Sequence, residues 1–125
     1  MITLEVDEAY AFDFLSIMEV KKMAFNDEDS DSAYVVCAKS IKRQVGEELF
    51  NKILLSRQYF DLLAINSAQF DLLNHIRAGG EVSADRLDYL NRRRYKLKVD
   101  LQTKFFNSPV AERKTENVSR DDESK

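Results

Sequence analysis

The sequence predicts an all-α fold, a single-domain antiparallel helical bundle of about four helices with a short extended N-terminal arm. Its 125 residues are 44% hydrophobic, which suffices for one modest core. The chain holds three glycines and one proline, so nothing forbids long helices before Pro109. Apolar residues recur at helical spacing, and the short connections at 55–58 and 79–82 favour neighbouring antiparallel helices.

The helical domain is expected to cover residues 1–106, followed by a polar tail at 107–125. The tail holds too few apolar residues to offset the entropy of ordering, so we expect it to be mobile. At the other end of the chain, Ile2, Leu4 and Val6 alternate with polar residues, which is typical of a short extended segment.

The chain is expected to be cytoplasmic and to make no contact with a membrane. Its longest apolar runs hold only a few residues, far fewer than the roughly 18 that a membrane-spanning helix needs. The N-terminal residues include acids where a secretory signal would place positive charge, and no long apolar segment follows them.

The first predicted helix runs from Glu8 to about Phe25, with Asp7 as its N-cap. One apolar stripe has five members: Ala11, Phe14, Leu15, Met18 and Phe25. Three more apolar residues lie on a second side: Phe12, Val20 and Met23. A helix that is apolar on two sides is either central in a bundle or partly covered by a second subunit.

The second predicted helix follows the acidic turn at 26–32 and is capped by Ser32. Its apolar stripe continues past Gly46: Tyr34, Ala38, Ile41, Val45 and Leu49. A glycine in a helix interior costs about 1 kcal/mol relative to alanine. Gly46 therefore marks either a close helix crossing or a break in the helix.

The third predicted helix spans about 57–78 and ends at Gly79 and Gly80, which favour the left-handed conformations of a helix C-terminus. The fourth spans 83–106, with Ser83 as its N-cap. Its apolar stripe is formed by five residues: Leu87, Leu90, Leu97, Leu101 and Phe105.

Charge is distributed unevenly along the chain. The net charge is −3, but residues 1–32 carry nine acidic and two basic residues, whereas 83–106 carry seven basic and three acidic ones. Arg94 falls on the apolar stripe of the fourth helix. A guanidinium there must either reach out to solvent or pair with a carboxylate from a facing helix, such as Asp13 or Glu19, and we favour the pair.

No residue pattern predicts a metal, a cofactor or a catalytic centre. The acidic turn has the alternating aspartates of a calcium loop, but Ser32 and Ala38 occupy the positions that require glycine and glutamate. His75 is the only histidine, which excludes a zinc site with two histidines from one chain. Cys37 lies among apolar residues and is expected to be a buried, unreactive thiol.

The leading functional prediction is a non-enzymatic protein that self-associates, with a two-fold dimer favoured and no other protein partner identified. Surplus apolar positions and the embedded arginine mark the expected interface: Phe12, Val20, Met23, Arg94, Tyr95 and Val99. One alternative is a nucleic-acid-binding accessory protein with a basic contact surface: Lys39, Lys42, Arg43, Arg92, Arg93 and Lys96. A second alternative is an enzyme without a recognisable motif, because active sites assemble from residues distant in sequence.

Two segments carry a resemblance to known proteins. The stretch AYAFDFLS at 9–16, with Glu19, Val20 and Lys21, and the closing LQTKFF at 101–106 resemble small uncharacterised proteins of tailed phages of marine bacteria. The resemblance implies location in the host cytoplasm, and it implies no activity or functional residue.

Overall fold

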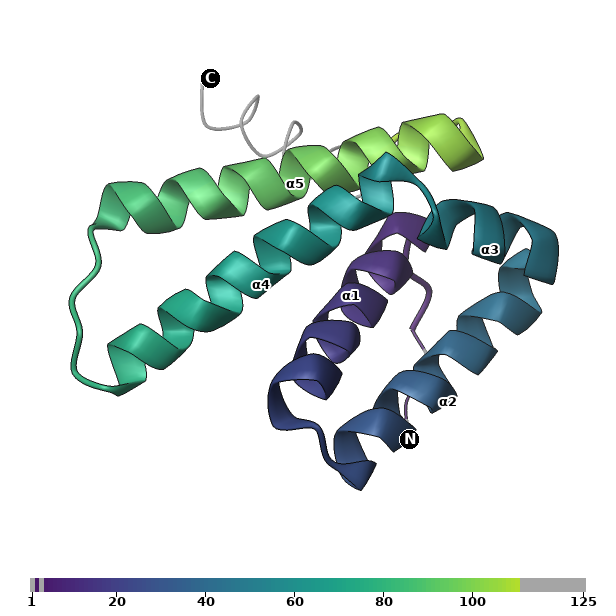
Figure 1. The fold of residues 1–125 in the computed structure, drawn as a ribbon. Coiled ribbons are helices and arrows are strands. Elements are labelled where there is room, and N and C mark those ends of the chain that lie inside the picture. Colours follow the sequence, from purple (N-terminus) through teal and green to yellow (C-terminus); the bar gives the residue numbers. More distant parts are fainter. Residues whose placement is uncertain (1, 3, 111–125) are drawn as a thin grey trace, which may run out of the picture.

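The computed structural model describes residues 2 and 4–110, which form five helices (Figure 1). These helices are α1 (Glu8–Phe25), α2 (Glu28–Val45), α3 (Glu47–Leu54), α4 (Arg57–Arg77) and α5 (Ala84–Phe106). The all-α prediction is therefore confirmed, with five helices in place of about four. No helix in the described part is long and apolar enough to cross a membrane.

Helix α1 is central in the bundle. It packs against α2 on one side and against both α4 and α5 on the other, while the short α3 links α2 to α4. Helices α4 and α5 form a long antiparallel hairpin whose connecting loop extends well beyond α1 (Figure 1). The central position explains why the sequence of α1 is apolar on more than one side.

The core contains residues from all five helices, with Phe12 near its centre. The Phe12 ring lies 6.0 Å from that of Phe50 and 6.5 Å from that of Phe106. Ten buried apolar residues form the main cluster: Ala9, Phe12, Leu15, Ile41, Phe50, Ile53, Tyr59, Leu62, Leu97 and Leu101.

The predicted buried stripe of α1 is confirmed for Leu15, which is fully buried, and is wrong for two of its other members. Phe14 and Phe25, which were expected in the buried stripe, are more than half exposed, whereas Phe12 and Val20 are buried. Periodicity alone could not choose between the two apolar sides. The docking of α4 and α5 makes that choice, because it covers the side that carries Phe12.

Side-chain hydrogen bonds cap the first turns of α2, α4 and α5. The Asp27 carboxylate accepts a hydrogen bond of 2.8 Å from the backbone N–H of Ser30, so α2 begins four residues before the predicted cap, Ser32. This hydrogen bond lowers the pKa of Asp27. Ser83 caps α5 as predicted, with its hydroxyl oxygen accepting from the N–H of Arg86 at 3.1 Å.

Gly46 breaks the second predicted helix into α2 and α3. Its φ is 94° and its ψ is 147°, a conformation that residues with a Cβ rarely adopt. No atom lies within 4 Å of the position that a Cβ would occupy. Of the two alternatives, the break is therefore the correct one, and no close helix crossing is involved.

Gly46→Ala is expected to lower the free energy of unfolding by about 1–3 kcal/mol, because alanine is strained at this φ. Chemical denaturation monitored by circular dichroism measures the change. Asn51→Ala, at an exposed position in α3, provides the control and should change the stability by less than about 0.5 kcal/mol. An unchanged or raised stability for Gly46→Ala would show that the break does not depend on glycine.

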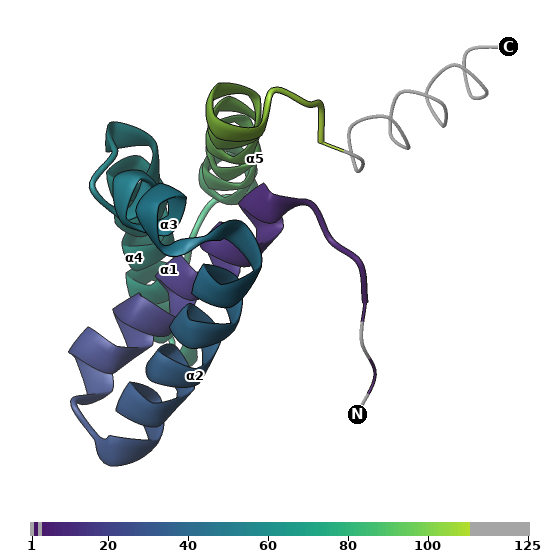
Figure 2. The same cartoon turned by 90° about the vertical axis from the view of Figure 1, so that its right-hand side faces the viewer.

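The described residues before α1 and after α5 differ in how they lie against the helices. The N-terminal arm, residues 2 and 4–7, leads away from the helices as an extended segment with its apolar side chains exposed (Figure 2). After α5, Asn107 adopts a φ of 50° and ends the helix, and Val110 is fully buried. The mobility expected of the tail stays a prediction for 107–110, and the rest of the tail, 111–125, lies outside the described residues.

Candidate functional site

Arg94 pairs with Asp13, one of the two partners that the sequence suggested. The guanidinium Nε donates to Asp13 Oδ1 at 3.0 Å, and Nη2 donates to Oδ2 at 2.5 Å. The Asp13 side chain is 5% exposed and the Arg94 side chain 28% exposed. Two parallel hydrogen bonds from a guanidinium to a carboxylate are the strong, geometrically specific form of an ion pair.

A polar network extends this pair into the bundle. The Asn66 side-chain amide donates to Asp13 Oδ1 at 2.9 Å and to the Ser16 hydroxyl oxygen at 2.6 Å. The Ser16 hydroxyl in turn donates to the backbone carbonyl of Asp13 at 2.7 Å. The network joins α1, α4 and α5, and each of its hydrogen bonds lies within the fold. We therefore assign it a structural role.

A second buried polar residue, Gln102, holds the start of α1. Its side-chain carbonyl accepts from the backbone N–H of Ala9 at 2.8 Å. Its amide donates to the Glu8 carboxylate at 3.0 Å and to the Ser108 hydroxyl oxygen at 2.9 Å. Gln102 thereby satisfies a first-turn N–H that no residue of α1 can bond, and it also fixes the residues that follow α5.

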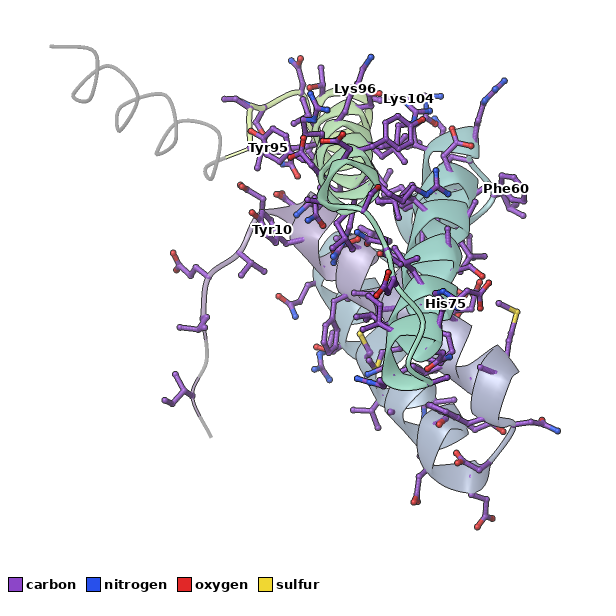
Figure 3. The ribbon with its side chains drawn as sticks, turned by 90° about the vertical axis from the view of Figure 1, so that its left-hand side faces the viewer. Tyr10, Phe60, His75, Tyr95, Lys96 and Lys104 are labelled. Carbon is purple, nitrogen blue, oxygen red and sulfur yellow. The ribbon has the colours of Figure 1, made fainter. Side chains whose placement is uncertain are left out.

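An open groove of about 1740 Å³ runs along α1 and α2 and is bordered by the N-terminal arm. Its apolar lining comes from all three segments: Leu4, Val6, Phe14, Ile17, Met18 and Val36. Lys98 and Tyr10 also line the groove, and the ammonium of Lys98 lies 4.0 Å from the centre of the Tyr10 ring. Tyr10 lies near the point where the arm joins α1 (Figure 3). Asp29, in the first turn of α2, also lines the groove.

The pKa values of one thiol and two phenols between α1, α2 and α4 are raised, which favours their neutral forms. Burial raises the pKa of the half-buried Cys37 thiol, which lines the groove. Burial also raises the pKa of Tyr34 and Tyr59, and the Glu19 carboxylate raises both further. A thiol is a nucleophile only as the thiolate, so Cys37 is poorly reactive at neutral pH.

Neither His75 nor the acidic turn forms a catalytic or metal site in the described residues. His75 is exposed on the last turn of α4 and does not line the groove (Figure 3). Among residues 2 and 4–110, no three histidine, cysteine or acidic side chains come together in a way that could hold a metal ion. The acidic turn itself becomes the N-cap and first turn of α2, where negative charge suits the helix dipole.

The structure does not gather the predicted interface residues on one surface. Phe12 and Val20 are buried within the chain, so neither is accessible to a second copy in this structure. Arg94 pairs with Asp13, and Tyr95 and Val99 are half-buried. Of the predicted set, Met23 alone is more than half exposed. Burial by α4 and α5 explains the difference, since the apolar surplus of α1 is used largely within the bundle.

The predicted nucleic-acid contacts fall on two separate helices. Lys39, Lys42 and Arg43 are on α2, whereas the other three are on α5, and α1 lies between these helices in the packing. Arg92 is 3.0 Å from the Asp88 carboxylate, and Lys96 lies on the outer side of α5 (Figure 3). The six cations therefore do not form a continuous basic surface of the kind that follows a phosphate backbone.

Sequence reasoning missed the groove. Its signal was Val36, an apolar residue that lies outside the predicted stripe of the second helix and is exposed in the structure. Ser32, Ala33 and Ser40 on the same side of α2 are small residues, which give no apolar periodicity. An exposed apolar position among small residues is easily taken for ordinary surface.

Comparisons with known proteins assign no family to the chain. No protein-family model, no curated protein and no solved structure matches it. The resemblance to phage proteins therefore stays a prediction, and function is inferred from the groove, its charges and the packing around it.

Proposed function

We propose that this protein is a non-enzymatic helical interaction protein that self-associates as a dimer through the groove along α1 and α2. The observation that carries the proposal is the exposure of large apolar side chains that line the groove. Val36 is 69% exposed and Phe14 is 54% exposed. In the arm, Leu4 is 76% exposed and Val6 is 60% exposed. Contiguous apolar surface of this kind is typical of interaction sites.

The expected strength of association follows from these side chains. Full burial of a large apolar side chain contributes roughly 1.5–3 kcal/mol, and a two-fold dimer buries Leu4, Val6, Phe14 and Val36 of both copies. Since each of these side chains is already partly buried in the single chain, the eight together contribute about 8–16 kcal/mol. Association itself costs roughly 4–15 kcal/mol in lost translational and rotational freedom. The two ranges overlap, so we expect a reversible dimer whose population depends on protein concentration.

The chemistry of the groove supports a binding role over a catalytic one. Asp13, which lines the groove, is engaged by Arg94 and Asn66, and the pKa of the Cys37 thiol is raised. A general base or a nucleophile needs a group that is free to take or give a proton near neutral pH. Most of the surface that the groove presents to a partner belongs to apolar side chains.

Phe14→Ser is expected to remove self-association while leaving the fold intact, because Phe14 is exposed in the single chain. Sedimentation equilibrium should show the mass of the wild-type protein rising from 14.5 kDa toward twice that value with concentration. The Phe14→Ser variant should stay at 14.5 kDa. Leu55→Ser is the matched control, since Leu55 is exposed at the α3–α4 junction and does not line the groove.

A wild-type protein that stays monomeric at the highest accessible concentration would overturn the proposal. Equal loss of association in the Phe14→Ser and Leu55→Ser variants would overturn the assignment of the groove. Circular dichroism of each variant establishes that the helices are retained.

A further inference from the structure

We propose that two copies pair antiparallel about a two-fold axis, with α2 of each copy against α2 of the other and Val36 at the axis. This inference rests on the proposed self-association and specifies its surface and geometry. A two-fold interface uses the same patch on both subunits, so that patch must be complementary to itself. The exposed side of α2 meets this requirement.

The relevant side of α2 is marked by three exposed residues at seven-residue intervals: Asp29, Val36 and Arg43. Seven residues make almost two helical turns, so these side chains follow one stripe along the helix. The small residues Ala33 and Ser40 lie between them and line the groove. Small side chains at a helix contact permit a short distance between helix axes.

The charges on this stripe favour the antiparallel orientation. Asp29 and Arg43 each lie seven residues from Val36, in opposite directions along the helix. With Val36 at the axis, Asp29 faces Arg43 of the partner subunit, and symmetry forms the same pair a second time. A parallel pairing would instead place like charges opposite each other, which is unfavourable.

The two ends of α2 reinforce this preference. Its first turn is acidic, with Glu28, Asp29 and Asp31, and its last turn is basic, with Lys42 and Arg43. Antiparallel pairing places the acidic end of each helix beside the basic end of the other. The helix dipoles favour the same arrangement, because the positive N-terminus of one helix then lies beside the negative C-terminus of its partner.

The groove supplies the remaining contact area. An 18-residue helix is about 27 Å long, so two α2 helices alone would make a small interface compared with the roughly 1,600 Å² of a standard one. In the proposed dimer, α2 of the partner also contacts Phe14 and Met18 of α1, which line the groove beside Val36. The exposed apolar residues of the arm, Leu4 and Val6, border the same space.

Charge reversal tests the proposed geometry. In Asp29→Arg or Arg43→Asp, both attractive pairs become repulsive, so we expect the dimer dissociation constant to rise at least about 10-fold at low salt. The double variant Asp29→Arg/Arg43→Asp restores both attractive pairs and should return to within about 3-fold of the wild type. An equimolar mixture of the two single variants should form a heterodimer of similar strength, because each pair in it again joins opposite charges.

Glu28→Arg is the matched control. It makes the same change in net charge in the same exposed first turn of α2, but Glu28 does not line the groove. Glu28 contributes only to the overall charge of the helix end and makes no pair in the proposed contact, so we expect the dissociation constant to rise by less than about 3-fold. Circular dichroism verifies the helical content of each variant.

The axis can be located by oxidative cross-linking. In a Cys37→Ser background, Val36→Cys places two thiols at the axis, where the short distance between the two Cα atoms permits a disulfide. Mild oxidation should convert this variant to a covalent dimer faster than Val35→Cys in the same background.

The outcomes separate the two proposals. A monomeric wild-type protein overturns self-association and this geometry together. A wild-type dimer whose single reversals do not weaken it, or whose double reversal and mixture do not recover, overturns the antiparallel α2 pairing and leaves self-association standing. Equal cross-linking at positions 35 and 36 would also overturn the placement of the axis.

Discussion

Arg94→Leu is expected to lower the free energy of unfolding by about 3–5 kcal/mol, because it removes one partner of a buried ion pair. The Asp13 side chain is 5% exposed, so without the guanidinium its charge would remain in the bundle with Asn66 as its remaining side-chain hydrogen-bond donor. Leucine fits the apolar stripe of α5 but cannot compensate that charge. Equilibrium unfolding in urea at neutral pH measures the loss.

Arg92→Leu is the matched control for this prediction. Arg92 is on the same helix and also pairs with an aspartate, Asp88, but both side chains are well exposed. Exposed pairs typically contribute about 0.2–1 kcal/mol, so the control should lose far less stability than Arg94→Leu. Similar losses in the two variants would show that the contact of Arg94 with Asp13 is no stronger than a surface pair.

A double-mutant cycle isolates the pair itself. In Asp13→Asn the carboxylate charge is absent, so the further change Arg94→Leu should cost less in that background than in the wild type. A coupling free energy near zero would contradict the proposed dependence of each residue on the other.

The features best predicted from the sequence depend either on residues close together in the chain or on a charge that needs a partner. Ser83 and Gly79 mark helix ends through their own side-chain and backbone preferences, and the structure confirms both. Asp13 could be suggested as a partner because an arginine on an apolar stripe requires a carboxylate or solvent. These arguments need little knowledge of how distant segments pack.

The features that were missed depend on that packing. Asp27 and Ser32 are both good N-caps, and the earlier residue succeeds because the intervening acidic residues suit the first turn of a helix. The orientation of α1 could not be read from its sequence, since Phe12 and Phe14 belong to competing apolar sides. Gly46 was compatible with a crossing or a break, and only its φ distinguishes the two.

The polar residues therefore divide into two groups with different roles. Asp13, Asn66 and Arg94 stabilise the contact of α1 with α4 and α5 inside the chain. Asp29 and Arg43 are exposed on α2 and are available to a second copy. The uneven charge along the sequence thus contributes at both levels, first within the bundle and then in the proposed pairing of two bundles.

Gln102→Leu is expected to lower the free energy of unfolding by about 2–4 kcal/mol, because it leaves buried polar groups without their partner. Gln102 is fully buried, and it bonds the backbone N–H of Ala9, the Glu8 carboxylate and the Ser108 hydroxyl. Leucine has a similar size but can accept or donate none of these hydrogen bonds. Urea unfolding gives the global loss.

The effect should also be visible locally, at the N-terminus of α1. Without Gln102 the Ala9 amide loses its hydrogen bond, so its hydrogen exchange should accelerate more than that of amides in the middle of α4. Gln69→Leu is the control, because Gln69 donates to Asn91 at an exposed site and should cost less than about 1 kcal/mol. If Ala9 exchanged at the wild-type rate in Gln102→Leu, the start of α1 would be held by packing around Phe12, and the hydrogen bonds of Gln102 would be dispensable.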